Sequence, residues 1–315
     1  MINKIKEEAL QFLNYNEDFN NYLKSLNKIT HISKGNINFF IVSNDNDNDN
    51  DNGNDNDNDN GNDNDNDNGN GNDNGNDNEN EKIHKNLDRI YKFANGFGYT
   101  FNIYLLLSPF KKSFKNNLKS PLNQFNTNTG FTYLTSSNTK MICIVRKEEY
   151  LKVIYHEIIH HISLIHRSFK VENINRLKKH FKILNVNIDP NEAIIEFWAT
   201  IMYLKQLSID TNKDFYELFK EELNYSLYKS YQINKLQKFN NGYWKDGETN
   251  LYCYVVFKTI IMYNIDIFMN IYTFPYDDTI ITDFLIKYSN LPLANARNNS
   301  KRKIMSLCFM VNSDS

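Results

Sequence analysis

The chain has 315 residues, of which 40% are apolar and 14% aromatic, and its formal net charge is -2. A chain of this length and apolar content can bury a sizeable core in one large or two small domains, which excludes an extended fibre and a wholly disordered chain. The near-neutral charge is an average, because residues 44–80 hold 13 of the 38 acidic residues and no basic residue. The remainder holds 25 acids against 36 bases and carries about +11.

The part of the chain before residue 44 predicts one helix and one strand. Apolar residues recur at helical spacing over 5–26, and the short apolar run over 37–42 is typical of a strand. Residues 44–80, by contrast, contain only Asn, Asp, Gly and one Glu. Because such a composition cannot bury enough apolar surface to offset the entropy of ordering, we expect a disordered, low-complexity insertion.

The segment that follows the insertion has the pattern of an α/β unit. Apolar residues at helical spacing are followed by a glycine break and by runs rich in β-branched and aromatic residues, which are typical of strands. We expect a helix over 82–94, strands over 100–107, 131–134 and 141–145, and a helix over 147–166. The last two strands are joined by a turn-rich connection and should form a hairpin.

From residue 190 onward, nearly every segment has a helical period. The predicted helices cover 191–207, 212–236, 250–272 and 278–288. The sequence therefore predicts an α+β fold, in which a small mixed β-sheet is followed by an all-helical C-terminal lobe. The expected divisions are a helix and first strand (1–43), the insertion (44–80), the rest of the α/β lobe (81–189) and the helical lobe (190–315).

The predicted helix over 147–166 contains the sequence HEIIH, an HExxH motif. His156 and His160 are one helical turn apart on the same face, so both imidazoles can reach one Zn²⁺ at about 2.0–2.1 Å. Glu157 points to the adjoining face, where it can take a proton from a water bound to the metal. Because the chain has only seven His, this spacing on a strong helix is improbable by chance. The motif predicts a zinc site.

A catalytic zinc site needs a third protein ligand and an open position for water. One candidate is Glu192, in the segment NEAIIE at the start of the next helix, and the other is His166, at the end of HEIIHHISLIH. If the first helix continues to His166, that residue lies about 9 Å beyond His160 along the helix axis and cannot reach the same ion.

HEIIH followed downstream by NEAIIE resembles the gluzincin zinc peptidases, the thermolysin-like group, whose second motif helix carries an NE-A-x-x-acid pattern. The resemblance implies a zincin-like fold and a peptidase with one Zn²⁺ per chain, held by His156, His160 and Glu192. Glu157 would activate the water, and Glu196 would accept a hydrogen bond from the other ring nitrogen of a ligand His. The chain differs from this group in the longer gap between the two motifs and in having Glu, not Asp, at position 196.

A second resemblance favours His166 as the third ligand. HExxHxxSxxH is similar to the metzincin pattern, with Ser163 at the position of a Gly that lets the chain turn back sharply so that the third His reaches the metal. Because Ser163 does not favour that turn, we prefer Glu192 and keep His166 as the alternative third ligand.

Peptide hydrolysis also needs a donor for the oxyanion of the tetrahedral intermediate. No His follows His180, so the His that thermolysin-like enzymes take from the C-terminal lobe is absent. Tyr243, Tyr252 and Tyr254 are the candidates in its place. The strand over 131–134 is our candidate for the sheet edge that holds an extended peptide by β-augmentation.

The sequence thus predicts a zinc metallopeptidase whose substrate is a peptide or a protein. The alternative is a non-catalytic protein whose basic body binds an acidic partner such as nucleic acid. Thirty Lys stand beside six Arg, a bias that we attribute to an AT-rich genome such as that of a protist or a large DNA virus. The lysines are scattered along the chain, which argues against nucleic acid as a partner.

We expect the chain to be soluble and intracellular. Charges at Lys4 and Lys6 interrupt the apolar core that a signal peptide would need. The most apolar stretch, 251–272, contains Lys258 and Asp266 and predicts a buried helix instead of a membrane span. Three Cys without CxxC spacing indicate neither a disulfide framework nor a thiolate site, which fits a reducing compartment.

Overall fold

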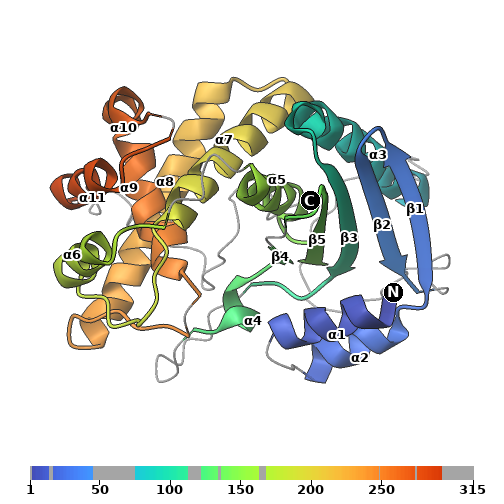
Figure 1. The fold of residues 1–315 in the computed structure, drawn as a ribbon, viewed down its shortest axis with the longest axis horizontal. Helices are drawn as coiled ribbons and strands as arrows, with labels where there is room; N and C mark the ends of the chain where they lie inside the picture. Colours follow the sequence, from blue (N-terminus) through green and yellow to red (C-terminus); the bar gives the residue numbers. More distant parts are fainter. Residues whose placement is uncertain are drawn as a thin grey trace, which may run out of the picture.

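The structure is a computed structural model. It describes residues 2–13, 17–44, 75–112, 122–133, 136–162, 168–247, 249–273 and 275–292. The first part of the chain forms a mixed β-sheet with helices on its faces, and the second part is mostly helical (Figure 1). This arrangement confirms the predicted α+β class.

Five strands form one sheet in the order β1-β2-β3-β5-β4. Their bounds are Lys28–Lys34 (β1), Ile37–Ser43 (β2), Thr100–Ser108 (β3), Gly130–Thr132 (β4) and Thr139–Arg146 (β5). The three inner strands are mutually parallel, and the edge strands β1 and β4 run antiparallel to their neighbours. The predicted hairpin is confirmed as β4 and β5. The sequence did not predict β1, because an exposed and largely polar edge strand lacks the apolar run that marks a buried one.

Side chains of the inner strands alternate between two cores. Phe101 and Ile103 on β3 face the core that contains α3 (Gly75–Ala94) and α5 (Tyr150–His161). Tyr104 and Leu106 face the other core, which α1 (Ile2–Phe12) and α2 (Glu17–Ser25) cover. The first part of the molecule is therefore a sheet between two helical layers (Figure 1).

The N-terminal helix predicted over 5–26 is wrong, because two helices, α1 and α2, occupy this range. Glu17 and Asp18 lie in the first turn of α2, where acidic side chains favour a helix start. At the other end of the insertion, α3 begins at Gly75, ahead of the expected boundary at residue 80. Residues 45–74, the rest of the insertion that we expect to be disordered, lie outside the described residues.

The first part also contains two short helices, η1 (Asn95–Phe97) and α4 (Gln124–Thr127). The other helices form the second part of the molecule. They are α6 (Val171–Phe181), α7 (Asn191–Thr211), α8 (Phe215–Phe239), a π-helical turn labelled η2 (Cys253–Phe257), α9 (Lys258–Tyr263), α10 (Ile265–Ile271) and α11 (Asp278–Lys287). Although α6 precedes the expected boundary at residue 189, it packs against α11: the side chain of Asn173 donates to Asp278 at 2.9 Å.

The single helix predicted over 250–272 is also wrong. Cys253–Tyr263 and Ile265–Ile271 meet at an angle of 92°. Asn264 lies at this break with non-helical backbone angles, and both its side-chain amide (2.9 Å) and its backbone N–H (3.2 Å) donate to the carbonyl of Ile260. Among the described residues, no single helix has the length and apolar character to cross a membrane, and only this bent pair passes that test, by length and composition.

Helix α5 lies between the sheet and α7 (Figure 1). It is buried on almost every side, so its apolar residues point in all directions. Its close approach to β4 depends on Gly130, because a Cβ there would meet Ile144 and Val153 side-chain atoms at 2.8 Å. The helix ends at His161, short of the expected end at residue 166, with Ile162 already extended.

Candidate metal centre

Three side-chain atoms converge between α5 and α7. The Nε2 atoms of His156 and His160 are 3.1 Å apart, and Oε2 of Glu192 lies 3.3 Å from the first and 3.4 Å from the second. His156 and Glu192 come from helices that are far apart in sequence but packed side by side. The three residues form a group that could hold a metal ion.

The spacing of these atoms fits an ion in a tetrahedral site. Ligands at about 2.05 Å from a common tetrahedral ion lie about 3.3 Å from one another, close to the three distances observed. In addition, Oε2 of Glu192 is buried, and among the described residues it has no well-aligned hydrogen-bond donor, although two imidazole nitrogens lie 3.3 and 3.4 Å away. A cation among the three atoms would satisfy this oxygen when both Nε2 atoms are unprotonated. The group of residues therefore fits a metal.

The local structure explains why Glu192 reaches this position. Helix α7 begins just after Pro190, and Asp189 accepts hydrogen bonds from the backbone and side-chain nitrogens of Asn191, at 3.0 and 2.6 Å. Glu192 therefore lies in the first turn of α7, where the free backbone N–H groups and the helix dipole stabilise a negative charge.

A chain of buried charges lies behind His156. Oε2 of Glu196 accepts from Nδ1 of His156 at 3.0 Å, and its other oxygen accepts from Lys152. Lys152 also lies 3.6 Å from Glu149, which pairs with Lys112 at 2.8 Å. When the ring of His156 is neutral, Glu196 holds its proton at Nδ1 and leaves Nε2 unprotonated toward the metal group.

These contacts shift several pKa values. Burial opposes protonation of His156, but the carboxylates of Glu192 and Glu196 outweigh it and raise the pKa of His156 to about 10. Burial favours the neutral form of Glu192, yet the two imidazoles hold its pKa well below the ordinary value. The pKa of Glu157 is raised, chiefly by burial. In the metal-free protein His156 is thus positively charged near neutral pH, between negatively charged Glu192 and Glu196.

We expect metal uptake to release about one proton per chain at pH 7.5. The pKa of His156 is about 10 without metal, so the ring is protonated at this pH and must lose its proton to bind a cation. Apparent zinc affinity should therefore rise about tenfold per pH unit between pH 7 and pH 9. Titration calorimetry in two buffers with different ionisation enthalpies measures the released protons. Uptake without proton release would contradict the protonated state of His156.

Glu157 and Tyr254 line a cavity of about 280 Å³ together with the three residues of the metal group. Glu157 is 6% exposed. The Tyr254 ring lies 5.7 Å from the His156 ring, and burial raises the pKa of its hydroxyl well above the ordinary value. Gly130 to Thr132 of the edge strand β4 line the same cavity. A proton acceptor, a neutral hydroxyl donor and a sheet edge therefore surround the metal group.

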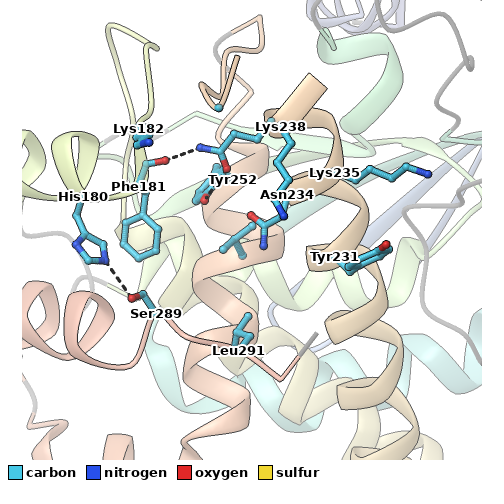
Figure 2. A pocket seen from close by; sticks show the side chains of 13 residues that line it. His180, Phe181, Lys182, Tyr231, Asn234, Lys235, Lys238, Tyr252, Ser289 and Leu291 are labelled. Carbon is cyan, nitrogen blue, oxygen red and sulfur yellow. Dashed lines mark hydrogen bonds between the residues drawn. The ribbon is translucent and has the colours of Figure 1, made fainter. Parts of the chain in front are cut away.

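The other two tyrosine candidates lie elsewhere. Tyr243 is 46% exposed. Tyr252 faces a second cavity of about 560 Å³ beside Phe181 (Figure 2). Its hydroxyl lies 3.5 Å from the side-chain oxygen of Gln237. Residues two apart on a helix point in nearly opposite directions, which explains why Tyr252 and Tyr254 face different cavities.

The remaining histidines differ in their positions. His166 and Ser163 lie outside the described residues, so the alternative third ligand stays a prediction. His161 is buried and bonds to the hydroxyl of Thr132 at 2.5 Å, which ties α5 to β4. His180 contacts Ser289 at 3.0 Å in the second cavity (Figure 2).

The sequence did not single out the buried lysines of this region. Lys152 precedes His156 by one helical turn, and a Lys on the same face as a motif His in an otherwise apolar helix is a signal that could have found it. Lys229 and Lys258 also line the metal cavity. They come from separate helical segments, and nothing in their spacing relates them to the motif.

The chain matches no protein-family model and no solved structure. It is similar to an uncharacterised protein, R210, of Acanthamoeba polyphaga mimivirus, with 25% identity over 116 residues that make up 34% of this chain and 29% of the relative. The chain thus spans less than a third of the length of this relative. The viral source of the relative agrees with the origin suggested by the lysine bias.

Proposed function

We propose that the protein is a zinc-dependent metallopeptidase of the gluzincin type. The observation that carries this proposal is the tetrahedral spacing of His156, His160 and Glu192, with the buried Glu157 in the same cavity. Nitrogen and carboxylate ligands in this number are typical of catalytic zinc. Zinc at this place would polarise the scissile carbonyl and make an attacking water more acidic.

Glu157 is the general base in this proposal. It accepts one proton from the water while the water oxygen forms a bond to the carbonyl carbon, and it then delivers that proton to the amide nitrogen. The C–N bond breaks, and a carboxylic acid and an amine are released. Burial raises the pKa of its carboxyl, which makes it a stronger proton acceptor than an exposed Glu. Its place in the cavity beside His156 and His160 supports this role.

The substrate would lie along β4. This strand is at the edge of the sheet, and its residues line the cavity. A peptide in extended conformation can pair with such an edge through its backbone, which would bring its carbonyl groups past the metal group. This position supports a peptide or protein as the substrate.

Tyr254 is the proposed donor to the oxyanion, and Tyr254→Phe is expected to lower kcat about 10²-fold with KM changed less than about threefold. Burial raises the pKa of this hydroxyl well above its ordinary value, so it stays neutral near neutral pH and can donate a hydrogen bond. Tyr252→Phe and Tyr243→Phe are the controls, since one ring faces the second cavity and the other is exposed. Steady-state kinetics that show equal losses for all three variants would contradict this role.

Removal and return of the metal test the proposal itself. A mixed peptide pool should be hydrolysed by the zinc-loaded protein, and a chelator should abolish hydrolysis. One equivalent of zinc per chain should restore it, because the site holds one ion. Mass spectrometry of the pool together with metal analysis measures both quantities. A fully zinc-loaded protein that cleaves no peptide in the pool would overturn the proposal.

A further inference from the structure

Two loop segments of the helical part, one after α6 and one after α8, run side by side. The backbone N–H of Trp244 donates to the carbonyl of Lys182 at 3.0 Å, and that of Leu184 donates to the carbonyl of Trp244 at 2.8 Å. This pairing places Ile183 opposite Trp244. Because the side chains of extended chain alternate between two sides, the neighbours of these two residues point the other way.

The inward side of this pair is packed and hydrogen-bonded. Ile183 and Trp244 are 4% and 3% exposed. The next inward residues are Asn185 and Asp246, both buried, and the side chain of Asn185 donates to the carboxylate of Asp246 and accepts from its backbone N–H at 3.0 Å. The inward side therefore holds the two segments together, and the outward side chains contribute little to this pairing.

The outward side exposes large apolar side chains to water. Leu184, Val186 and Tyr243 are 53%, 74% and 46% exposed, and Phe239, which ends α8 four residues before Tyr243, is 67% exposed. Single exposed apolar residues are common, but four on adjoining segments are typical of an interaction site. We refer to these four side chains as the apolar loop face.

Lysines flank the apolar loop face. Segments 178–186 and 235–247 contain one acidic residue, the buried Asp246, and six lysines: Lys178, Lys179, Lys182, Lys235, Lys238 and Lys245. Three of them, Lys182, Lys235 and Lys238, line the second cavity, next to the paired segments (Figure 2). These lysines are far apart in the sequence, and only the pairing of the two segments brings them to one surface. This surface is therefore both apolar and strongly basic.

We propose that the apolar loop face docks on an anionic membrane surface. Its side chains would enter the boundary between headgroups and acyl chains, and the lysines would meet the lipid phosphates and carboxylates. Nucleic acid would also attract the lysines but offers little to exposed aliphatic side chains such as Leu184 and Val186. Protein interfaces are depleted in Lys, which disfavours a protein partner. This inference does not rest on the proposed peptidase function.

Flotation of the full chain with lipid vesicles tests the inference. Vesicles of phosphatidylcholine alone are compared with vesicles that contain about 30% phosphatidylserine. We expect the protein to partition onto the anionic vesicles at least about tenfold more strongly, and added salt should weaken this partition because it screens the lysines. Absent partition, or equal partition onto both kinds of vesicle, would overturn the inference, and this comparison needs no variant to fold.

The apolar contribution is tested by a double substitution. Leu184→Ser together with Val186→Ser should weaken partition onto the anionic vesicles about tenfold or more, because less apolar area leaves water. Ile209→Ser is the matched control, since Ile209 is 68% exposed and lies on α7 beside Asp210, which pairs with Arg89 of α3. Unchanged partition of the double variant would show adsorption by charge alone and would overturn docking through the apolar loop face.

The basic contribution is tested in the same way. Lys182→Gln together with Lys238→Gln should weaken partition about tenfold or more, since each lysine near the surface adds to the attraction. Lys220→Gln is the control, because Lys220 is exposed and lies about 22 Å from Lys235 along α8. If the double lysine variant binds like the wild type, these lysines have no part in docking and the proposed anionic surface is wrong.

Two further measurements exclude other occupants of this face. Residues 301–311 also combine basic and apolar side chains, so a variant without residues 293–315 should keep its partition, and loss of partition would transfer the membrane contact to that segment. Sedimentation of the free protein should give a monomer. A dimer that the Leu184→Ser and Val186→Ser substitutions separate would assign the apolar loop face to a second copy of the chain and overturn the inference.

Discussion

Glu157→Gln is expected to lower the rate of peptide hydrolysis by about 10²–10⁴-fold while the protein keeps one zinc per chain. An amide of the same shape cannot accept the proton of the attacking water, so the reaction loses its general base. The three proposed zinc ligands are other residues, and they remain in place. Loss of the negative charge of Glu157 also removes repulsion of Glu192, whose carboxylate contributes to the raised pKa of Glu157.

The measurement pairs kcat on a peptide pool with zinc content after dialysis. Glu172→Gln is a matched control, because it makes the same substitution at an exposed position on α6. The control should retain full activity and zinc. Hydrolysis by Glu157→Gln within about tenfold of the wild-type rate would remove Glu157 from the role of general base.

Glu192→Ala and Glu196→Ala should differ in kind, although the two carboxylates lie one turn apart on α7. Glu192→Ala removes one of three ligand atoms, so the remaining pair of His should lose zinc in dialysis and hydrolysis should be lost at stoichiometric zinc. Glu196→Ala removes the acceptor at Nδ1 of His156. Loss of such a partner typically costs about 10–100-fold in metal affinity or activity, so excess zinc should restore part of the function.

Zinc content and hydrolysis at several zinc concentrations distinguish the two variants. Glu196→Ala also leaves Lys152 without one of its carboxylate partners, so urea unfolding of both metal-free variants should accompany the titration. Full zinc affinity in Glu192→Ala would move the third ligand elsewhere, with His166 as the next candidate. Equal losses in both variants that excess zinc does not restore would contradict their different roles.

The part of the site that lies on one helix could be predicted from sequence. His156, Glu157 and His160 need only the helical period to come together, and α5 is a helix there. Glu192 is different, because its distance from the motif depends on how α7 packs on α5. Only the resemblance of the two segments to a known family placed it, and the group of His156, His160 and Glu192 agrees with that expectation.

The features that the sequence did not reveal depend on long-range packing or on a single side chain. The segment bends at Asn264, although its apolar period continues through that residue. Strand β1 is held by pairing with β2 and not by burial of its own side chains. Which of the three candidate tyrosines lies beside the metal group depends on how η2 is oriented relative to α5, and the spacing of residues along the chain does not determine that orientation. The α+β class could be predicted from sequence, because it depends on the strand and helix periods of many residues and not on any one side chain.

Strand β4 has only three residues, Gly130 to Thr132, and under the proposed function this would limit the length of substrate that pairs with the sheet. Three residues of extended chain span about 10 Å, so a paired peptide would gain backbone hydrogen bonds over no more than two or three of its own residues. Residues further from the cut bond would add little affinity. A short peptide should therefore be as good a substrate as a long unfolded chain with the same residues around the cut bond.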